Sequence, residues 1–395
     1  MKICTLARVG DVVEGSAFDR TCPRIPALAV TRTGRVIAAW DVRADWRDLP
    51  GAFDIAYRVS DDAGCTWGAV RILRRHEGVH GFGDASFIAD PATGRLYCWY
   101  VGSRGESYFS AEPGGEGLSL WLSTSDDDGE TWTHRDFSAL RAADVGGMFA
   151  ASGNGCALAS GRLLQGFVLR VDGLNYTAIG RSDDGGDTWI LGPRLGPDCD
   201  ENKVLPLRDG SVLLHARARP RRRWALSHDG GETFGRPVPH EQLVDPACNG
   251  GLATWGDLTV ATLLDDENER RRLTLRWSLD EGRTWPGQVL LDAGPCAYSV
   301  AAELPDGALG VLLGGRGLRG TAVRAHPRRH DRHHPTRQLS RCSDPARRRP
   351  GRPPRLSLKR PRLRVSAGVA REVNGGAVGG AGAPSCCRPG LVPDG

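Results

Sequence analysis

The sequence predicts an all-β fold, a six-bladed β-propeller. Three observations support this: one motif occurs five times, short apolar segments lie between its copies, and no segment holds a helical period over several turns. The motif, called here the aspartate repeat, reads Ser-x-Asp-x-Gly-x-Thr followed by Trp or Phe. Its five aspartates are Asp62, Asp127, Asp184, Asp229 and Asp280. Their long, uneven spacing excludes a helical solenoid and fits one four-stranded blade per copy, with variable loops.

Each aspartate repeat predicts a tight turn. The aspartate side chain can accept hydrogen bonds from backbone N–H groups just ahead of it, and the glycine two positions later tolerates a positive φ. The closing Trp or Phe is large and apolar, so we expect it to pack against the strand that follows.

Short strands are predicted between the repeats. They are rich in Val, Leu, Trp and Tyr, are bounded by Gly, Asp and Pro, and occupy residues 34–40, 94–101, 118–125, 161–171, 210–218 and 271–278. Residues 1–9 (MKICTLARV) also predict a strand, because their apolar run is too short and interrupted for a signal peptide. We therefore expect a cytoplasmic protein by default. The repeats mark five blades, and a sixth must join the two chain ends to close the ring.

Composition agrees with a globular protein. Of the 395 residues, 40% are apolar and 25% are charged, which suffices for a core, and no segment approaches a membrane span. The eleven cysteines are an odd number without a C-x-x-C pair. We therefore expect neither a disulfide framework nor a zinc site, and no cofactor.

Residues 316–395 differ in composition from the rest of the chain. They contain no Trp, Tyr or Phe, and they carry eighteen Arg and one Lys against three Asp and one Glu. Such a segment cannot bury enough surface to offset its ordering entropy, so we predict a propeller over 1–315 and a disordered basic tail over 316–395. The histidine-rich stretch 326–334 lies in this tail and is not expected to bind metal. The tail also lacks the interleaved aromatics of a specific nucleic-acid arm, so only non-specific adhesion is expected from it.

One stretch near the N-terminus is more informative than the turns. CPRIPALAV places Arg24 between a loop and a strand, and Arg-Ile-Pro-Ala-Leu followed by five aspartate repeats resembles the bacterial sialidases (exo-α-neuraminidases) with BNR repeats, over about residues 1–313. The resemblance implies a glycoside hydrolase, a retaining exo-α-sialidase that removes terminal sialic acids from glycoconjugates through a tyrosyl-enzyme intermediate. It also implies sialylated glycans as partners, a monomer, and no membrane or specific nucleic-acid partner.

The resemblance also implies the site residues. Three arginines would bind the substrate carboxylate, one aspartate would be the acid/base, a glutamate and a tyrosine would form the nucleophile pair, and two residues would contact the side of the sugar's 4-hydroxyl. The three arginines match Arg24, Arg217 and Arg270, and the acid/base matches Asp48. The nucleophile pair matches Glu201 and Tyr298, and the two residues on the side of the 4-hydroxyl match Arg43 and Asp84. Arg271 or Arg272 could replace Arg270, but the family spacing to the following Leu-Thr-Leu favours Arg270.

The chemistry of a sialoside suits these residue types. The sugar carries a carboxylate on its anomeric carbon, and arginine offers a planar, bidentate donor for it. That charge would repel a carboxylate nucleophile, whereas a tyrosine is neutral until Glu201 takes its proton; sialidases are thus an exception to the two-carboxylate scheme of retaining glycosidases. Asp48 would need a raised pKa to be protonated when it donates to the leaving oxygen. By contrast, Arg222, in the basic loop 220–223, is expected to have no role in binding.

The chain departs from the family pattern in three respects. Secretion signals are common among bacterial members, and none is visible in this sequence. Pro23 stands where the family has an aromatic residue before the arginine. After residues 305–313 the family continues with two more strands, whereas this chain enters its basic segment. We hypothesise that the reading frame changes near Gly314 and that the last blade is incomplete. The alternative function is then a catalytically inactive propeller that binds sialylated or other acidic glycans.

Overall fold

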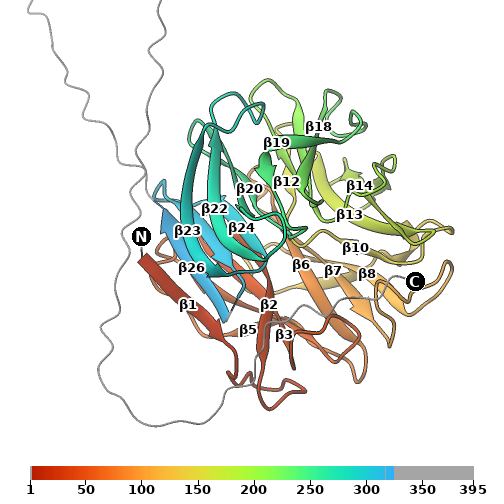
Figure 1. The fold of residues 1–395 in the computed structure, drawn as a ribbon. Coiled ribbons are helices and arrows are strands. Elements are labelled where there is room, and N and C mark those ends of the chain that lie inside the picture. The colour runs from red at the N-terminus through yellow and green to blue at the C-terminus, as the bar shows by residue number, and fades with distance from the viewer. Residues whose placement is uncertain (1, 316, 324–395) are drawn as a thin grey trace, which may run out of the picture.

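The computed structural model describes residues 2–315 and 317–323, and this part of the chain is all-β. Six sheets, antiparallel except for the short parallel pairing of β11 with β6, are arranged as blades around a common centre (Figure 1), and the helical content is one short 3₁₀ turn, η1 (Ser138–Leu140). The first strand of each blade lies innermost, so β2 contacts β6 and β24, and β16 contacts β20. The predicted all-β, six-bladed propeller is confirmed. No helix in the described part is long and apolar enough to cross a membrane.

The first three blades follow the order of the chain. Blade 1 consists of β2 (Cys22–Val30), β3 (Val36–Arg43), β4 (Asp54–Ser60) and β5 (Arg71–Arg74). Blade 2 consists of β6 (Gly81–Ala89), β7 (Leu96–Ser103), β8 (Leu118–Ser125) and β9 (Thr133–Asp136), with β11 (Gly153–Asn154) added beside β6. Blade 3 consists of β10 (Met148–Ala150), β12 (Cys156–Ala157), β13 (Leu163–Val171), β14 (Leu174–Ser182) and β15 (Ile190–Leu191).

The last three blades complete the ring. Blade 4 consists of β16 (Asn202–Pro206), β17 (Val212–Ala216), β18 (Arg221–Ser227) and β19 (Val238–Val244). Blade 5 consists of β20 (Leu252–Trp255), β21 (Leu258–Leu264), β22 (Arg271–Ser278) and β23 (Gly287–Pro295). Blade 6 consists of β24 (Ser299–Glu303), β25 (Leu309–Leu313), β26 (Gly317–Val323) and β1 (Lys2–Arg8). Each predicted strand segment, the N-terminal one included, therefore overlaps an observed strand.

The aspartate repeats form the predicted turns, and each joins the third strand of its blade to the fourth. In the copy between β14 and β15, Asp184 accepts hydrogen bonds from the Thr188 hydroxyl and, at 2.9 Å, from its N–H. These bonds lower the pKa of Asp184 to about 2. Gly186 donates its N–H to the Ser182 hydroxyl at 2.9 Å and has a φ of +87°, which only glycine adopts without strain. The other four copies repeat these bonds.

The core consists of layers of buried apolar side chains between neighbouring blades. The closing aromatics of the repeats lie in these layers, each in the layer shared with the preceding blade: Trp67, Trp132, Trp189, Phe234 and Trp285. They were expected to pack against the following strand. The structure differs because each turn folds back over the neighbouring sheet, where apolar surface of the preceding blade is available.

The prediction of an incomplete last blade is wrong. Residues 317–323, which lie beyond the predicted propeller boundary at 315, form β26, and this strand pairs with β25 on one side and β1 on the other (Figure 1). A sheet needs backbone donors and acceptors more than particular side chains, and Leu318 supplies an apolar contact, since it is fully buried beside Leu6 and Leu312. The ring therefore closes with the N-terminal strand outermost. The predicted disordered tail and its histidine-rich stretch otherwise lie outside the described residues.

Candidate active site

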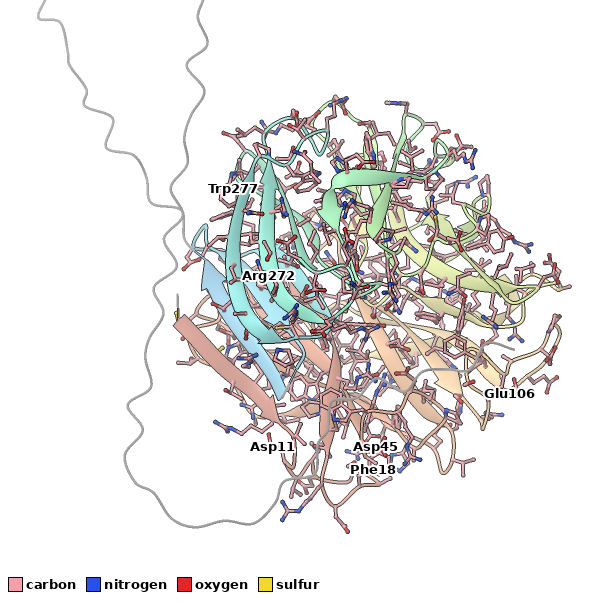
Figure 2. All side chains as sticks on the ribbon, in the orientation of Figure 1. Asp11, Phe18, Asp45, Glu106, Arg272 and Trp277 are labelled. Carbon is pink, nitrogen blue, oxygen red and sulfur yellow. The ribbon has the colours of Figure 1, made fainter. Side chains whose placement is uncertain are left out.

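All eight predicted site residues lie at one end of the blades. They come from the starts of first strands, the ends of second strands, and the adjoining loops, which meet because neighbouring strands are antiparallel. Arg24 on β2, for example, lies opposite Asp41 on β3. Figure 2 shows the same polarity in blade 5: Arg272, at the start of β22, lies nearer the middle of the view, and Trp277 lies further out along the strand.

Tyr298 is the point at which three predicted residues meet. Its hydroxyl accepts a hydrogen bond from Arg217 Nη1 at 2.9 Å, and the same Nη1 contacts Glu201 Oε2 at 2.6 Å. The guanidinium groups of Arg217 and Arg270 lie 5.9 and 5.8 Å from the centre of the tyrosine ring. Burial of the hydroxyl and the Glu201 carboxylate outweigh both arginines and raise the pKa of Tyr298, so the phenol is neutral.

Glu201 is held on both carboxylate oxygens. It precedes β16 and is 1% exposed. Its Oε1 accepts hydrogen bonds from Ser152 Oγ and Asn249 Nδ2, both at 3.0 Å, while Oε2 faces Arg217. Because a buried carboxylate is costly without partners, these three donors fix which oxygen faces the tyrosine.

The structure distinguishes the three arginines of the 270–272 run. Arg270 reaches the Tyr298 ring and donates to the carbonyl of Ala247 at 3.2 Å. Arg271 instead pairs with Asp266 at 2.7 Å on the surface, and Arg272 donates to the backbone carbonyl of Asp265, just after β21. Only the first of the three side chains therefore faces the tyrosine.

Arg24 and Asp48 form the opposite side of the site. Arg24 Nη1 contacts Asp48 Oδ1 at 2.9 Å, and Arg43 Nη1 contacts the same oxygen at 2.7 Å. Asp48 is nevertheless 68% exposed, on a loop whose next residue, Leu49, is buried with Phe53. Partial burial opposes the two arginines, but their charges prevail and lower the pKa of Asp48. A raised pKa was expected, so the structure gives the opposite direction, because both guanidinium groups pair with this carboxylate.

A buried charge cluster lies behind Arg43. Its guanidinium donates to Asp41 Oδ2 through Nη2 at 2.6 Å and through Nε at 3.2 Å, and Asp84 Oδ1 lies at 3.7 Å. Asp84 has a φ of +62°, and its N–H donates to the Asp41 carboxylate at 3.1 Å. Since Asp41 takes the closer position on the arginine, burial and the Asp41 charge raise the pKa of Asp84.

A solvent-open depression of about 200 Å³ connects the two sides. Its lining residues are Pro23, Arg24, Ile25, Trp46, Ala297, Tyr298, Gly314 and Gly315. Arg24 and Tyr298 thus face one space, and Trp46, which is 44% exposed, stands at its edge. Arg24, Arg217 and Arg270 all lie around Tyr298, so the site presents several cations and a neutral phenol to an incoming ligand.

Sequence reasoning missed the buried residues that support the site. Asp41 precedes Arg43 by two positions, so it could have been found from strand alternation, since both side chains point to the same face. Ser152 and Asn249 lie in loops without a motif, and only the fold brings them to Glu201. Trp46, between the loop residues Asp45 and Arg47, also carried no signal of its own.

The prediction that Arg222 lies in a basic loop is wrong, because it is buried on β18, whereas the expectation that it has no role in binding stays a prediction. Its side chain is 1% exposed, pairs with Asp245 at 2.8 Å, and donates to the carbonyl of Cys248 at 2.7 Å. The segment 245–249 also carries the carbonyl that Arg270 contacts and the amide that contacts Glu201. Arg222 therefore holds a loop that contributes to the site. Among the described residues, no group of three His, Cys, Asp or Glu could hold a metal ion.

The fold and the site define a class of protein: a six-bladed propeller whose central end gathers arginines, carboxylates and a tyrosine around an open depression. Residues 34–311 match the model of the BNR repeat-like domain. The chain belongs to the sialidase family with BNR repeats.

Two related proteins illustrate the similarity. The sialidase of Micromonospora viridifaciens is 35% identical over 325 residues, which cover 75% of this chain and 50% of that protein. The sialidase of Bacteroides fragilis is 26% identical over 345 residues, covering 77% of this chain and 62% of that protein. The chain therefore spans between half and two thirds of the length of these relatives.

Solved structures share the fold. A Hadza microbial sialidase superimposes with a TM-score of 0.72 at 27% identity, over 76% of this chain and 65% of that one. A leech intramolecular trans-sialidase gives 0.73 at 16% identity, over 82% of this chain and 70% of that one. The second likeness concerns the fold alone.

Proposed function

We propose that the chain is a retaining exo-α-sialidase that hydrolyses terminal sialic acids of glycoconjugates through a tyrosyl-enzyme intermediate. One observation carries the proposal: Tyr298 and Glu201 share Arg217 Nη1, at 2.9 and 2.6 Å, and Tyr298 lines an open depression together with Arg24. Membership of the sialidase family supports the same conclusion.

The arginines would bind and orient the substrate. A sialoside carries its carboxylate on the anomeric carbon, so Arg24, Arg217 and Arg270 would hold that carbon beside the tyrosine hydroxyl. Arg24 is engaged with Asp48 before substrate arrives. A substrate carboxylate competes for this guanidinium and adds negative charge nearby, and both effects raise the pKa of Asp48. Binding would therefore prepare Asp48 to act as the acid.

Two steps with balanced proton transfers follow. In the first, the Tyr298 oxygen bonds to the anomeric carbon as the glycosidic bond breaks, Glu201 takes the phenolic proton, and Asp48 protonates the leaving oxygen. In the second, Asp48 takes a proton from water, whose oxygen attacks the same carbon. The tyrosyl bond then breaks, and Glu201 returns its proton to the phenolate. Two inversions give net retention.

A second function is favoured by one observation. In the structure the pKa of Asp48 is lowered. If Asp48 stayed ionised, the arginines could still bind an acidic glycan, but no acid would protonate the leaving oxygen. An inactive glycan-binding propeller is therefore the alternative to the hydrolase. A cleavage assay, rather than a binding assay, distinguishes the hydrolase from the inactive glycan-binding propeller.

A fluorogenic 4-methylumbelliferyl sialoside tests the proposal. Wild type should release the fluorophore, and Tyr298→Phe should keep the fold while turnover falls by several orders of magnitude, because only the nucleophilic oxygen is lost. A 2,3-difluoro sialic acid should label Tyr298 covalently. Tyr100→Phe is the matched control, since it also loses a buried hydroxyl but lies within blade 2. No release by folded wild type, or an adduct on another residue, would refute the corresponding part of the proposal.

A further inference from the structure

A lysine is buried behind the candidate nucleophile pair. Lys203 lies on β16, two residues after Glu201, and is 1% exposed. Its Nζ donates to three oxygens: the carbonyl of Ser152 at 2.6 Å, the carbonyl of Asn202 at 3.2 Å, and Asn249 Oδ1 at 2.9 Å. An ammonium group needs such acceptors in the protein interior, because an unpaired buried charge costs several kcal/mol or more.

The partners of Lys203 are also the partners of Glu201. Asn249 directs its Oδ1 to the lysine and its Nδ2 to Glu201 Oε1, at 3.0 Å. Ser152 accepts the lysine on its backbone carbonyl and donates its hydroxyl to the same Oε1, at 3.0 Å. An amide group has one acceptor side and one donor side, so the ammonium determines which side of Asn249 faces the carboxylate.

The orientation of Glu201 depends on this arrangement. Two donors occupy Oε1, which leaves Oε2 facing Arg217 beside the Tyr298 hydroxyl. If the Asn249 amide turned over, its oxygen would face Oε1, and two acceptors would repel each other in a buried site. The carboxylate would then rotate away from the tyrosine.

We propose that Lys203 is a positioning residue: by fixing Asn249 and Ser152, it holds Glu201 in the orientation in which that carboxylate can take the proton of Tyr298. This proposal rests on the hydrolase function proposed above. It identifies a residue that supports Glu201, the proton acceptor of that reaction, from the interior of the propeller. Burial lowers the pKa of Lys203 to about 7 although the charge of Glu201 opposes the shift, so the ammonium form depends on this carboxylate and is favoured below about pH 7.

Lys203→Met tests the proposal, because it keeps the length of the side chain and removes the ammonium. With the 4-methylumbelliferyl sialoside, kcat should fall at least tenfold while KM stays within about twofold, since the arginines are untouched. Asn249→Ala should lower kcat similarly. The kcat of the double variant should fall no further than that of the worse single variant, because both changes break the same hydrogen-bond connection from Lys203 through Asn249 to Glu201.

A control and a second variant keep the result unambiguous. Ser123→Ala removes buried hydrogen bonds to His134 and Tyr100 in blade 2 and should lower stability without changing kcat. If Lys203→Met does not fold, Lys203→Gln replaces it. An unchanged kcat in the folded variant, equal changes in kcat and KM, or additive losses in the double variant would overturn the proposal.

A measurement without catalysis separates this proposal from the proposed function. The chain has three lysines, Lys2, Lys203 and Lys359, so selective ¹³C,¹⁵N-lysine labelling gives few NMR signals. Glu201→Gln should shift the Lys203 ammonium signal, whereas Asp126→Asn, on the surface, should not. If wild type cleaves no sialoside but this shift occurs, the hydrolase function fails and the coupling of Lys203 to Glu201 stands. If the Lys203 signal does not respond, the positioning role is refuted.

Discussion

Replacing Arg217 with lysine tests the centre of the candidate site most directly. The guanidinium touches Glu201 and Tyr298 through one nitrogen, lies 3.8 Å from Asp200 through Nε, and is 18% exposed. Lysine keeps the charge but carries it on a different stem and lacks the planar group that places Nη1 between the two partners while Nε faces Asp200.

The expected loss follows from the contacts that are removed. A hydrogen bond to a charged group contributes about 1.5–3 kcal/mol, and we expect lysine to lose the equivalent of one of the two bonds. A factor of ten corresponds to about 1.4 kcal/mol, so kcat/KM should fall roughly 10- to 150-fold. The affinity for a transition-state analogue of sialic acid should fall by a similar factor.

The control is the same change at a surface pair. Arg95 binds Asp126 through Nε at 2.7 Å and through Nη2 at 3.0 Å, and the two side chains are 37% and 68% exposed. Arg95→Lys therefore also breaks a bidentate pair, but exposed pairs contribute about 0–1 kcal/mol and this one is remote from Tyr298. The measurements are kcat/KM and the thermal unfolding of Arg217→Lys and Arg95→Lys. Equal losses of kcat/KM in both, or a wild-type value for Arg217→Lys, would show that Arg217 does not bind the substrate.

Three further predictions concern stability. The pKa values of Asp62, Asp127 and Asp184 are about 2, below their values in the unfolded chain. Their contribution to the free energy of unfolding is therefore complete above about pH 4 and disappears as the pH falls toward 2. Changing all three to Asn should flatten this pH dependence, as urea unfolding at several pH values would show. Leu318→Ala should lower the free energy of unfolding by about 2–5 kcal/mol, because this side chain is fully buried. For the same blade, a chain ending at Gly315 should aggregate, whereas one ending at Val323 should stay soluble, as sedimentation would show. Arg222→Lys should lose about 1–3 kcal/mol and lower kcat/KM, and a neutral outcome would contradict its role in holding residues 245–249.

The regular part of the fold could be predicted because its signals are local. An aspartate, a glycine and a threonine at fixed spacing are enough to form a turn, and alternating apolar residues are enough to indicate a strand. The prediction that a sixth blade joins the two chain ends is confirmed, but the prediction that this blade is incomplete is wrong, because its last pairing involves residues 317–323, which carry no strand signal. Residues 317–323 lack the side-chain pattern of the family, so the strand was predicted to be missing. Their backbone nevertheless pairs with β25 and β1.

The site divides in a similar way. Arg24, Asp48 and Tyr298 could be named as candidate site residues from the sequence, because each has recognisable neighbours in the chain. Their supports could not, because Ser152 and Asn249 reach Glu201 from loops about fifty residues or more away in the chain. Burial changed the interpretation of Arg222 for the same reason, since only the folded chain shows that its charge is paired inside the protein.

The charges of the site explain why Arg24, Arg43 and Arg217 each contact a carboxylate of the protein itself. Arg24 and Arg43 share Asp48, and Arg217 contacts Glu201. Clustered cations would repel one another unless carboxylates lay between them, so the folded protein supplies negative charge in advance. Under the proposed function, an anionic ligand would replace an internal carboxylate rather than neutralise free arginines. The carboxylate easiest to replace would be the exposed one, Asp48, and this is the residue that a hydrolase would need in its protonated form.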